Sequence, residues 1–239
     1  MIKIQHLTKT FGACRAVDNL SLDVAAGEIF GFLGPNGAGK TTTVKILSGI
    51  MAPTSGRVLM GGRDLALEPL TVKRSIAYIP DEPFVYPKLT GFEFLRFLGD
   101  LYDVPCREQI RRIPQLLETF ELSERSGELL ESYSHGMRQK LLIAGILLRS
   151  PRVVLFDEPT VGLDPKSIRR FKIMLADMAS NGAAVFMCTH ILEMAEKLCT
   201  SVGIIHRGRL IVKDTVAAVK RLAAGGGKSL EDVFLELTG

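Results

Sequence analysis

Residues 34–41 read GPNGAGKT, and this stretch constrains the fold more than any other part of the chain. It matches the pattern G-x-x-x-x-G-K-[S/T], in which a glycine-rich turn joins a β-strand to an α-helix. The strand-type run GEIFGFL precedes it, and the helix-type run TTTVKIL follows it. The motif and both neighbours therefore predict a strand–loop–helix unit and a fold of the α/β class.

The residue types of this loop predict that it binds phosphate groups. Its glycines allow successive backbone N–H groups to point inward at phosphate oxygens, and a helix starting at Lys40 would add its dipole. Lys40 would place its charge on the outer phosphates, and the Thr41 hydroxyl would coordinate Mg²⁺. A coincidental glycine-rich turn is the alternative. The predicted nucleotide-binding residues are Gly34, Pro35, Asn36, Gly37, Ala38, Gly39, Lys40, Thr41 and Thr42.

Two acidic residues follow the apolar run VVLF at residues 153–156. In an open parallel sheet, ligands gather at the carboxyl ends of the strands, so Asp157 and Glu158 should face the same crevice as the phosphate loop. Asp157 fits a Mg²⁺ partner that acts directly or through water. Glu158 fits a general base that polarises an attacking water. A solvated acidic turn is the alternative interpretation.

The spacing of apolar residues divides the chain into four segments. Strand-type sequence dominates residues 1–88 and returns at 151–206, whereas helical spacing fills residues 89–150. We therefore expect a nucleotide-binding core in two parts, 1–88 and 151–206, around an inserted α-helical subdomain. Pro114 predicts a helix start or a kink inside that subdomain. Residues 207–239 are a C-terminal extension, with Gly225–Gly227 as a loop before a short final helix.

The composition of the chain indicates which broad classes of protein it fits. Of the 239 residues, 46% are hydrophobic and 23% charged, as is typical of a soluble globular protein. The net charge of +4 suits an anionic ligand or a neighbouring membrane surface but requires neither. The four scattered cysteines have neither zinc-site nor disulfide-framework spacing. The longest apolar runs are about eight residues, too short for a membrane-spanning helix of roughly 20, and we see no signal peptide.

Several motifs together resemble the ATP-binding subunit of an ABC transporter. They are the phosphate loop with Lys40, the DEP triplet at 157–159, the VGLD turn at 161–164 and the CTH triplet at 188–190. The likeness runs from about Ile2 to His206. It implies an α/β fold with a P-loop NTPase (RecA-like) parallel-sheet core, an N-terminal antiparallel β subdomain and an inserted α-helical subdomain. It also implies ATP hydrolysis, with ATP and Mg²⁺ as cofactors.

The resemblance assigns further site residues. Phe11 lies at the position of the aromatic residue that stacks on adenine; the alternative is a core Phe at a strand end. His190 lies at the switch histidine, which contacts the γ-phosphate and the attacking water, so the implied catalytic set is Glu158, His190 and Lys40. Asp164 lies in the loop that crosses the dimer interface in that family.

The stretch SYSHGMRQK at residues 132–140 resembles the family's signature motif, commonly LSGGQ. Ser134 is expected to cap the helix that follows, and its hydroxyl with the N–H groups around Gly136 would form an anion site at a helix N-terminus. In the family this site faces the γ-phosphate held by another subunit. His135 and Met137 depart from the common motif, and an ordinary helix cap is the alternative for the whole stretch.

Asp81 is the clearest departure from the family pattern, because a Gln usually follows the proline of AYIPDE. Two unit charges about 5 Å apart interact by roughly 3 kcal/mol at an effective dielectric near 20. That energy is favourable towards Mg²⁺ and unfavourable towards phosphates. Our hypothesis is that Asp81 faces the metal, directly or through water, beside Thr41 and Asp157. A solvated loop is the alternative. Asp81 or Glu82 would then relay the nucleotide state to the helical subdomain.

The segment PFVYPKLTGFEFLRFLGDLY carries many aromatic residues in a region where the family receives a coupling helix from its membrane partner. We predict that most of them belong to the core and that the remainder form a hydrophobic dock. The five in question are Phe84, Phe92, Phe94, Phe97 and Tyr102.

The favoured hypothesis is the ATP-hydrolysing motor of a membrane transporter, located in the cytoplasm and peripheral on the inner face of the cell membrane. Its partners would be an integral membrane permease subunit and a second ATP-binding cassette, either a copy of this chain or a different one. Export is favoured because the tail Ser229–Leu237 resembles the ending of bacterial ABC-2-type exporter subunits. The alternative is a soluble ABC ATPase that acts on ribosomes or DNA, although no basic stripe suggests nucleic-acid binding. A P-loop GTPase is a third possibility, but no N/T-K-x-D segment is present.

Overall fold

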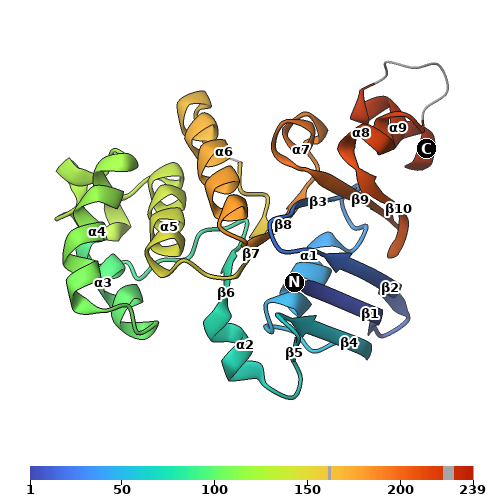
Figure 1. Ribbon diagram of the computed structural model, residues 1–239, viewed down its shortest axis with the longest axis horizontal. Helices are drawn as coiled ribbons and strands as arrows, with labels where there is room; N and C mark the ends of the chain where they lie inside the picture. Colours follow the sequence, from blue (N-terminus) through green and yellow to red (C-terminus); the bar gives the residue numbers. More distant parts are fainter. Residues whose placement is uncertain (161–162, 223–228, 239) are drawn as a thin grey trace. The chain divides into compact units, whose positions relative to one another are not determined.

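The computed structural model describes residues 1–160, 163–222 and 229–238 (Figure 1). Contacts divide the chain into two compact units. The first contains Met1–Tyr78, Arg152–Glu158 and Phe171–Gly239, and the second contains Ile79–Pro151 and Pro159–Arg170. The second unit therefore begins before the 89–150 subdomain predicted from the sequence and includes a separate later stretch.

A small antiparallel sheet occupies the N-terminal part of the first unit. It consists of β1 (Ile2–Phe11), β2 (Cys14–Val24), β4 (Ser55–Met60) and β5 (Arg63–Asp64), in the order β2-β1-β4-β5. Buried and exposed residues alternate along the second half of β2, as in a strand with one face on the core. β1 and β2 have 10 and 11 residues.

The larger sheet carries the remaining strands in the order β10-β9-β3-β8-β7-β6. Its strands are β3 (Ile29–Leu33), β6 (Ile76–Ile79), β7 (Val153–Asp157), β8 (Ala184–Thr189), β9 (Ser201–His206) and β10 (Arg209–Thr215). β3 pairs in parallel with β8 and β9, and β7 pairs in parallel with β8. Every residue of β3, β7 and β8 is buried, because helices or the small sheet cover both faces.

Helix α1 (Lys40–Leu47) joins the two sheets. It contacts β7 and β8 of the larger sheet and β2 of the small one, as Figure 1 shows. The cluster of buried side chains around it spans both sheets and includes Ile4, Leu22, Phe32, Val44, Leu47 and Phe186. On the other side of β3 lies α7 (Leu192–Leu198). Because β3, β7 and β8 run in parallel, the loops that leave their carboxyl ends meet at one edge of the sheet.

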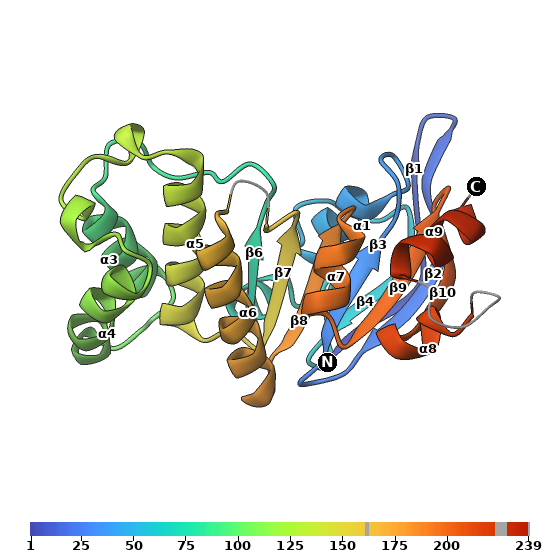
Figure 2. The same ribbon diagram turned by 90° about the horizontal axis from the view of Figure 1, so that it is seen from above.

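The second unit contains a bundle of three helices that contact one another in pairs (Figure 2). They are α3 (Gly91–Leu101), α4 (Cys106–Thr119) and α5 (His135–Arg149). Of the two alternatives predicted at Pro114, the helix start is wrong, because α4 begins at Cys106 and continues past Pro114 to Thr119, and the kink stays a prediction. A proline in a helix interior loses one backbone hydrogen bond. Burial of Ile113 and Leu117 in the bundle outweighs this loss, since packing supplies most helical stability.

The aromatic residues of the 84–102 segment are mostly at the surface, so the prediction that most belong to the core is wrong. Phe94 is buried, whereas the exposed fraction is 72% for Phe84, 41% for Phe92 and 38% for Phe97, and Tyr102 is half-buried. The face of α3 that packs on the bundle contains small residues beside Phe94, namely Gly91 and Gly99. The helical period therefore turns Phe92 and Phe97 outward.

Four further helices complete the described chain: α2 (Pro69–Ser75), α6 (Pro165–Ser180), α8 (Val216–Lys220) and α9 (Leu230–Thr238). Residues 165–170 of α6 belong to the second unit and the remainder to the first. The predicted loop at Gly225–Gly227 and residues 161–162 of the VGLD turn lie outside the described residues. Over residues 1–160, 163–222 and 229–238, no helix combines the length and the apolar character that crossing a membrane requires.

Candidate functional site

The phosphate loop connects the end of β3 at Leu33 to the start of α1 at Lys40. Gly39 caps the helix in the left-handed conformation, with φ of 108°, and a Cβ there would collide with the carbonyl oxygen of Ala16. A Cβ at Gly34 would lie 2.5 Å from the carbonyl oxygen of Ile205. Both positions therefore require glycine because the loop backbone lies directly against neighbouring chain.

Lys40 lies inside the curve of this loop and is 6% exposed. Its ammonium group donates hydrogen bonds to the carbonyl oxygens of Gly34 at 2.6 Å and Pro35 at 3.1 Å. The N–H groups in the first turn of α1 have no acceptor within the helix. The loop therefore combines a cation, backbone donors and a helix N-terminus, which are the elements of an anion-binding site.

Thr41 and Asp157 bring two oxygen ligands together at the end of β7. The Thr41 Oγ1 atom is 3.5 Å from Oδ1 of Asp157, and Asp157 is 3% exposed. Mg²⁺ prefers oxygen ligands and usually keeps several waters or phosphate oxygens. Among the described residues, no group of three or more His, Cys, Asp or Glu side chains could hold a metal. The hydroxyl and carboxylate oxygens of Thr41 and Asp157 are of the kind that Mg²⁺ prefers, so these two side chains fit such an ion.

Glu158 follows Asp157 in the left-handed conformation, with φ of 50°. This conformation costs of order 1–3 kcal/mol for a residue other than glycine. The Glu158 N–H donates to the carbonyl oxygen of Cys188 at 3.0 Å, which holds this turn beside the end of β8. The carboxylate lies within reach of His190, whose Nδ1 is 2.8 Å from Glu158 Oε1. The Glu158 side chain is 12% exposed and that of His190 is 51% exposed, so the pair faces solvent through the histidine.

Thr189 is a residue of this site that the sequence analysis did not single out. Its hydroxyl donates to Glu158 Oε2 at 2.9 Å and accepts the Ile191 N–H at 3.1 Å. One side chain thus orients the Glu158 carboxylate and the start of the chain that leads into α7. The available signal was a polar residue at the end of the otherwise apolar run AVFMC.

Cys188 lies beneath the phosphate loop, with its Sγ 3.7 Å from the carbonyl oxygen of Lys40. Burial raises the pKa of the Cys188 thiol well above its usual value. The thiol therefore stays protonated and acts as packing rather than as a nucleophile.

Phe11 ends β1 and is 46% exposed, so the alternative of a core phenylalanine is wrong. The ammonium group of Lys9 lies 5.0 Å from the centre of the ring. The ring is therefore available for stacking against a flat ligand.

The signature-like residues belong to the second unit. Ser134 is the N-cap of α5, and its hydroxyl accepts the Met137 N–H at 3.3 Å. The helix begins at His135, with Ser134 and His135 exposed and Gly136 and Met137 half-buried. The expected cap is thus confirmed, and it presents the first turn of α5 to solvent.

Asp164 and Asp81 also lie in the second unit. Asp164 accepts hydrogen bonds from the Ser167 N–H at 2.8 Å and hydroxyl at 2.7 Å, just before and within the first turn of α6. These bonds, followed by the nearby Lys140 ammonium, hold the pKa of Asp164 well below its usual range. Asp164 therefore stays charged and stabilises the start of α6. Asp81 and Glu82 are exposed.

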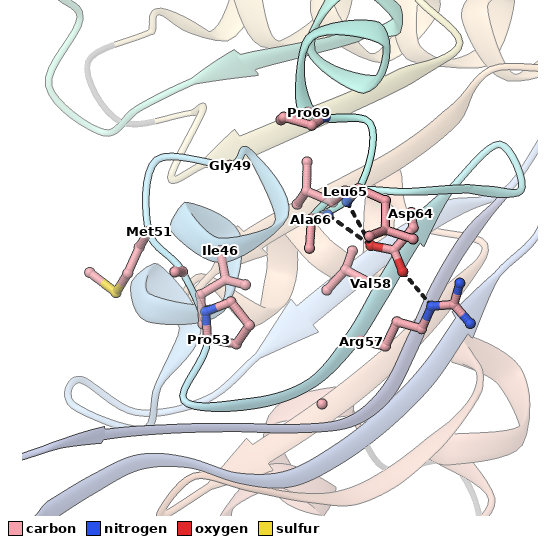
Figure 3. Close-up of a pocket in the computed structure, with 13 residues that line it drawn as sticks. Ile46, Gly49, Met51, Pro53, Arg57, Val58, Asp64, Leu65, Ala66 and Pro69 are labelled. Atoms are coloured by element: carbon pink, nitrogen blue, oxygen red, sulfur yellow. Dashed lines mark hydrogen bonds and ion pairs between the residues drawn. The ribbon is translucent and has the colours of Figure 1, made fainter.

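A separate pocket of about 600 Å³ lies at the opposite end of α1 from the phosphate loop (Figure 3). Its walls are mainly apolar and include Ile46, Met51, Pro53, Val58 and Leu65. On one side, Asp64 pairs with Arg57 and accepts the N–H groups of Ala66 and Leu67. The sequence analysis did not predict this pocket.

Comparisons with known proteins bear on the family and the fold of this chain. A family model described as "ABC transporter" matches residues 17–161. The linearmycin resistance ATP-binding protein LnrL of Bacillus subtilis (strain 168) is 35% identical over 215 residues, which are 90% of this chain and 69% of LnrL. A solved ATP-binding subunit of an ABC transporter is 35% identical and has a TM-score of 0.95 over 100% of both chains. The bacterial ABC transporter cassette MJ0796, solved as a dimer, is 25% identical with a TM-score of 0.81, over 90% of this chain and 98% of that one.

Proposed function

The chain belongs to the ABC transporter family, and from this premise we propose that it drives export through a separate membrane subunit by hydrolysing Mg-ATP. It is an ABC ATPase with the α/β fold of P-loop NTPases. The observation that carries the proposal is the convergence of Lys40, Asp157 and Glu158 at the carboxyl ends of β3 and β7, the two strands that flank β8. Phosphate binding, metal binding and water activation would then occur at one edge of the sheet.

The proposed mechanism follows from the contacts of each residue. Lys40 and the N–H groups of α1 stabilise the charge that develops on the outer phosphates during hydrolysis. Glu158 accepts a proton from the attacking water, and Thr189 holds the carboxylate in place. His190, within 2.8 Å of Glu158, reaches the γ-phosphate from the solvent side. A Mg²⁺ ion held by Thr41 and Asp157 would neutralise phosphate charge.

We propose the remaining site residues on the family pattern. Phe11 stacks on adenine, and Asp81 faces the metal, directly or through water. Ser134, His135, Gly136 and Met137 contact the γ-phosphate of a second cassette, and Asp164 lies at the interface between the two cassettes. The exposed N-terminus of α5 supports the trans contact, because the positive end of a helix dipole favours an anion.

The membrane partner is proposed to dock on aromatic residues of the second unit. The rings of Tyr86 and Phe97 meet edge-on with centres 5.3 Å apart, and Phe84 lies 5.9 Å from Tyr86. A pocket of about 450 Å³ beside Phe84 is lined by Glu82, Val85, Leu130 and Arg138, among others. An exposed aromatic cluster next to a pocket is typical of a protein-binding surface. We therefore place the protein in the cytoplasm, at the inner face of the membrane.

Isolation from native membranes tests the transporter proposal. We expect this protein to be recovered together with an integral membrane subunit after mild detergent extraction, as mass spectrometry would show. Export is supported by the name of LnrL, a resistance protein, and by the tail at Ser229–Leu237. Recovery exclusively with ribosomes or DNA would instead support the second candidate, a soluble ABC ATPase.

A mixing experiment tests the shared active site. Lys40→Ala and Ser134→Asp should each abolish ATP hydrolysis, the second because its charge repels the γ-phosphate while Asp still caps α5. Mixed dimers of the two variants contain one intact site, so the mixture should regain about a quarter of wild-type turnover if two copies pair with two-fold symmetry.

Phosphate release from the separate and mixed variants measures the effect. Ser134→Asn is the matched comparison, because it removes the hydroxyl and still caps the helix without adding charge, so it separates the effect of the added charge from loss of the hydroxyl. Recovery of no activity from the mixture, with both variants folded, would contradict a site shared between two copies of this chain.

A further inference from the structure

His190 lies two residues before α7, which begins at Leu192. With 7 residues, α7 is too short to be stable by itself, so its placement depends on contacts with the rest of the protein. Thr189 holds the chain at the entrance of α7. At its exit, the Cys199 N–H donates to the Ala195 carbonyl oxygen at 2.8 Å and the Thr200 N–H donates to that of Ile29 at 2.8 Å. These backbone contacts fix both ends of α7 but leave its outer face to other elements.

That outer face carries Glu196, which binds two elements of the C-terminal extension at once. Its Oε1 atom accepts a hydrogen bond from the ammonium group of Lys220, the last residue of α8. Its Oε2 atom accepts the N–H of Leu230, the first residue of α9, at 3.3 Å. The bond from Lys220 is the main cause that lowers the pKa of Glu196, although burial acts in the opposite direction. The carboxylate therefore stays charged and joins α7, α8 and α9.

An apolar cluster lies beneath the contacts of Glu196 with Lys220 and Leu230 and extends to the phosphate loop. Its buried members are Leu33, Ala195, Val202, Ile204, Val219, Leu230 and Val233. Leu33 directly precedes Gly34 of the loop, and Ala195 is in α7. Figure 2 shows α8 and α9 beside β9 and β10, and α9 also contacts α7. The C-terminal extension thus packs against Leu33, which leads into the phosphate loop, and against α7, which follows His190.

We infer that Glu196 is a positioning residue for ATP hydrolysis: by clamping α8 and α9 to α7, it sets the placement of His190 against Glu158. The inference rests on the proposed function of that pair. Loss of the clamp lets α7 shift, and the imidazole loses its alignment with the attacking water. Glu196 contacts α8 and α9 rather than the phosphate loop or Phe11, so we expect turnover to fall while ATP affinity stays the same.

Glu196→Gln tests the inference in the full chain, assayed together with any membrane subunit that accompanies it. Gln keeps the shape but loses the charge that binds Lys220. Because small misplacements of reacting groups are costly, we expect kcat to fall about 3- to 10-fold with KM for ATP unchanged. Hydrogen exchange of the amides at residues 189–198 should rise. The double variant Glu196→Lys with Lys220→Glu, which restores the pair with reversed charges, should recover part of kcat.

Glu193→Gln is the matched control, because Glu193 is on the same helix but pairs with Lys197 within α7 rather than with the extension. It should leave kcat and exchange unchanged. If Glu196→Gln does not fold, Lys220→Met removes the other partner of the same contact. It should then give the same fall in kcat and the same rise in exchange. A variant with faster exchange at 189–198 and wild-type kcat would overturn the inference. An inactive wild-type protein would instead contradict the proposed function.

Discussion

Replacing Glu158 with Gln is expected to lower kcat for ATP hydrolysis by about 10²- to 10⁴-fold, the usual contribution of a general base. The amide cannot accept a proton from water, yet its oxygen can still accept the hydrogen bond of the Thr189 hydroxyl. The local geometry should therefore persist, and ATP should bind as before. Phosphate release at saturating Mg-ATP measures kcat, and equilibrium binding of a fluorescent ATP analogue measures affinity.

Glu68→Gln is a suitable control for this substitution. Glu68 forms an exposed ion pair with Arg63 at 2.6 Å, a type of contact that contributes little to stability. It should leave turnover unchanged. If Glu158→Gln retains turnover within a factor of ten of wild type, another group activates the water, and the base would have to be sought elsewhere.

Replacing Lys40 with Ala is expected to weaken Mg-ATP binding and to reduce kcat/KM by about 10²-fold or more, because a preorganised cation in a partly enclosed site is lost. The ammonium group already lies within the loop, 2.6 Å from the Gly34 carbonyl oxygen. ATP binding therefore requires little movement of the side chain. Titration calorimetry with ATP and Mg²⁺ measures the affinity, and steady-state kinetics give kcat/KM.

Lys45→Ala separates this specific effect from a general loss of positive charge. Lys45 is on the same helix, in its last turn and away from the loop. Its removal should leave ATP affinity within about twofold of wild type, since water and salt screen the half-buried Lys45 charge over the distance to the loop. Equal weakening by both variants would mean that the net charge, rather than the position of Lys40, governs binding.

Local patterns were sufficient to predict the ATP-binding core from the sequence. A glycine-rich loop between a buried strand and a helix allows few other structures, and acids at the end of an apolar strand are directed to the carboxyl edge of a parallel sheet. The structure confirms the strand–loop–helix unit, the helices of the second unit and the cap at Ser134.

The errors arose where packing outweighed local preference. Pro114 disrupts an isolated helix, but α4 continues through it because its apolar face is buried in the bundle. From the sequence, we assigned most aromatic residues of the 84–102 segment to the core, Phe92 and Phe97 among them, because they are apolar. Their exposure depends on which face of α3 meets the bundle, and Gly91 and Gly99 on the packed face decided this.

The sequence by itself determined the phosphate loop, the strands around it and the acids near them, because these features depend on residues close together in the chain, whereas His190 was assigned through the family resemblance. The tertiary structure alone decided how Thr189 orients Glu158, why Glu158 adopts a left-handed conformation, and that Glu196 joins α7 to α8 and α9. Each of these contacts joins residues separated by many positions or by a strand crossover. Their geometry exists only once the sheet has assembled, so no local pattern in the chain can specify it.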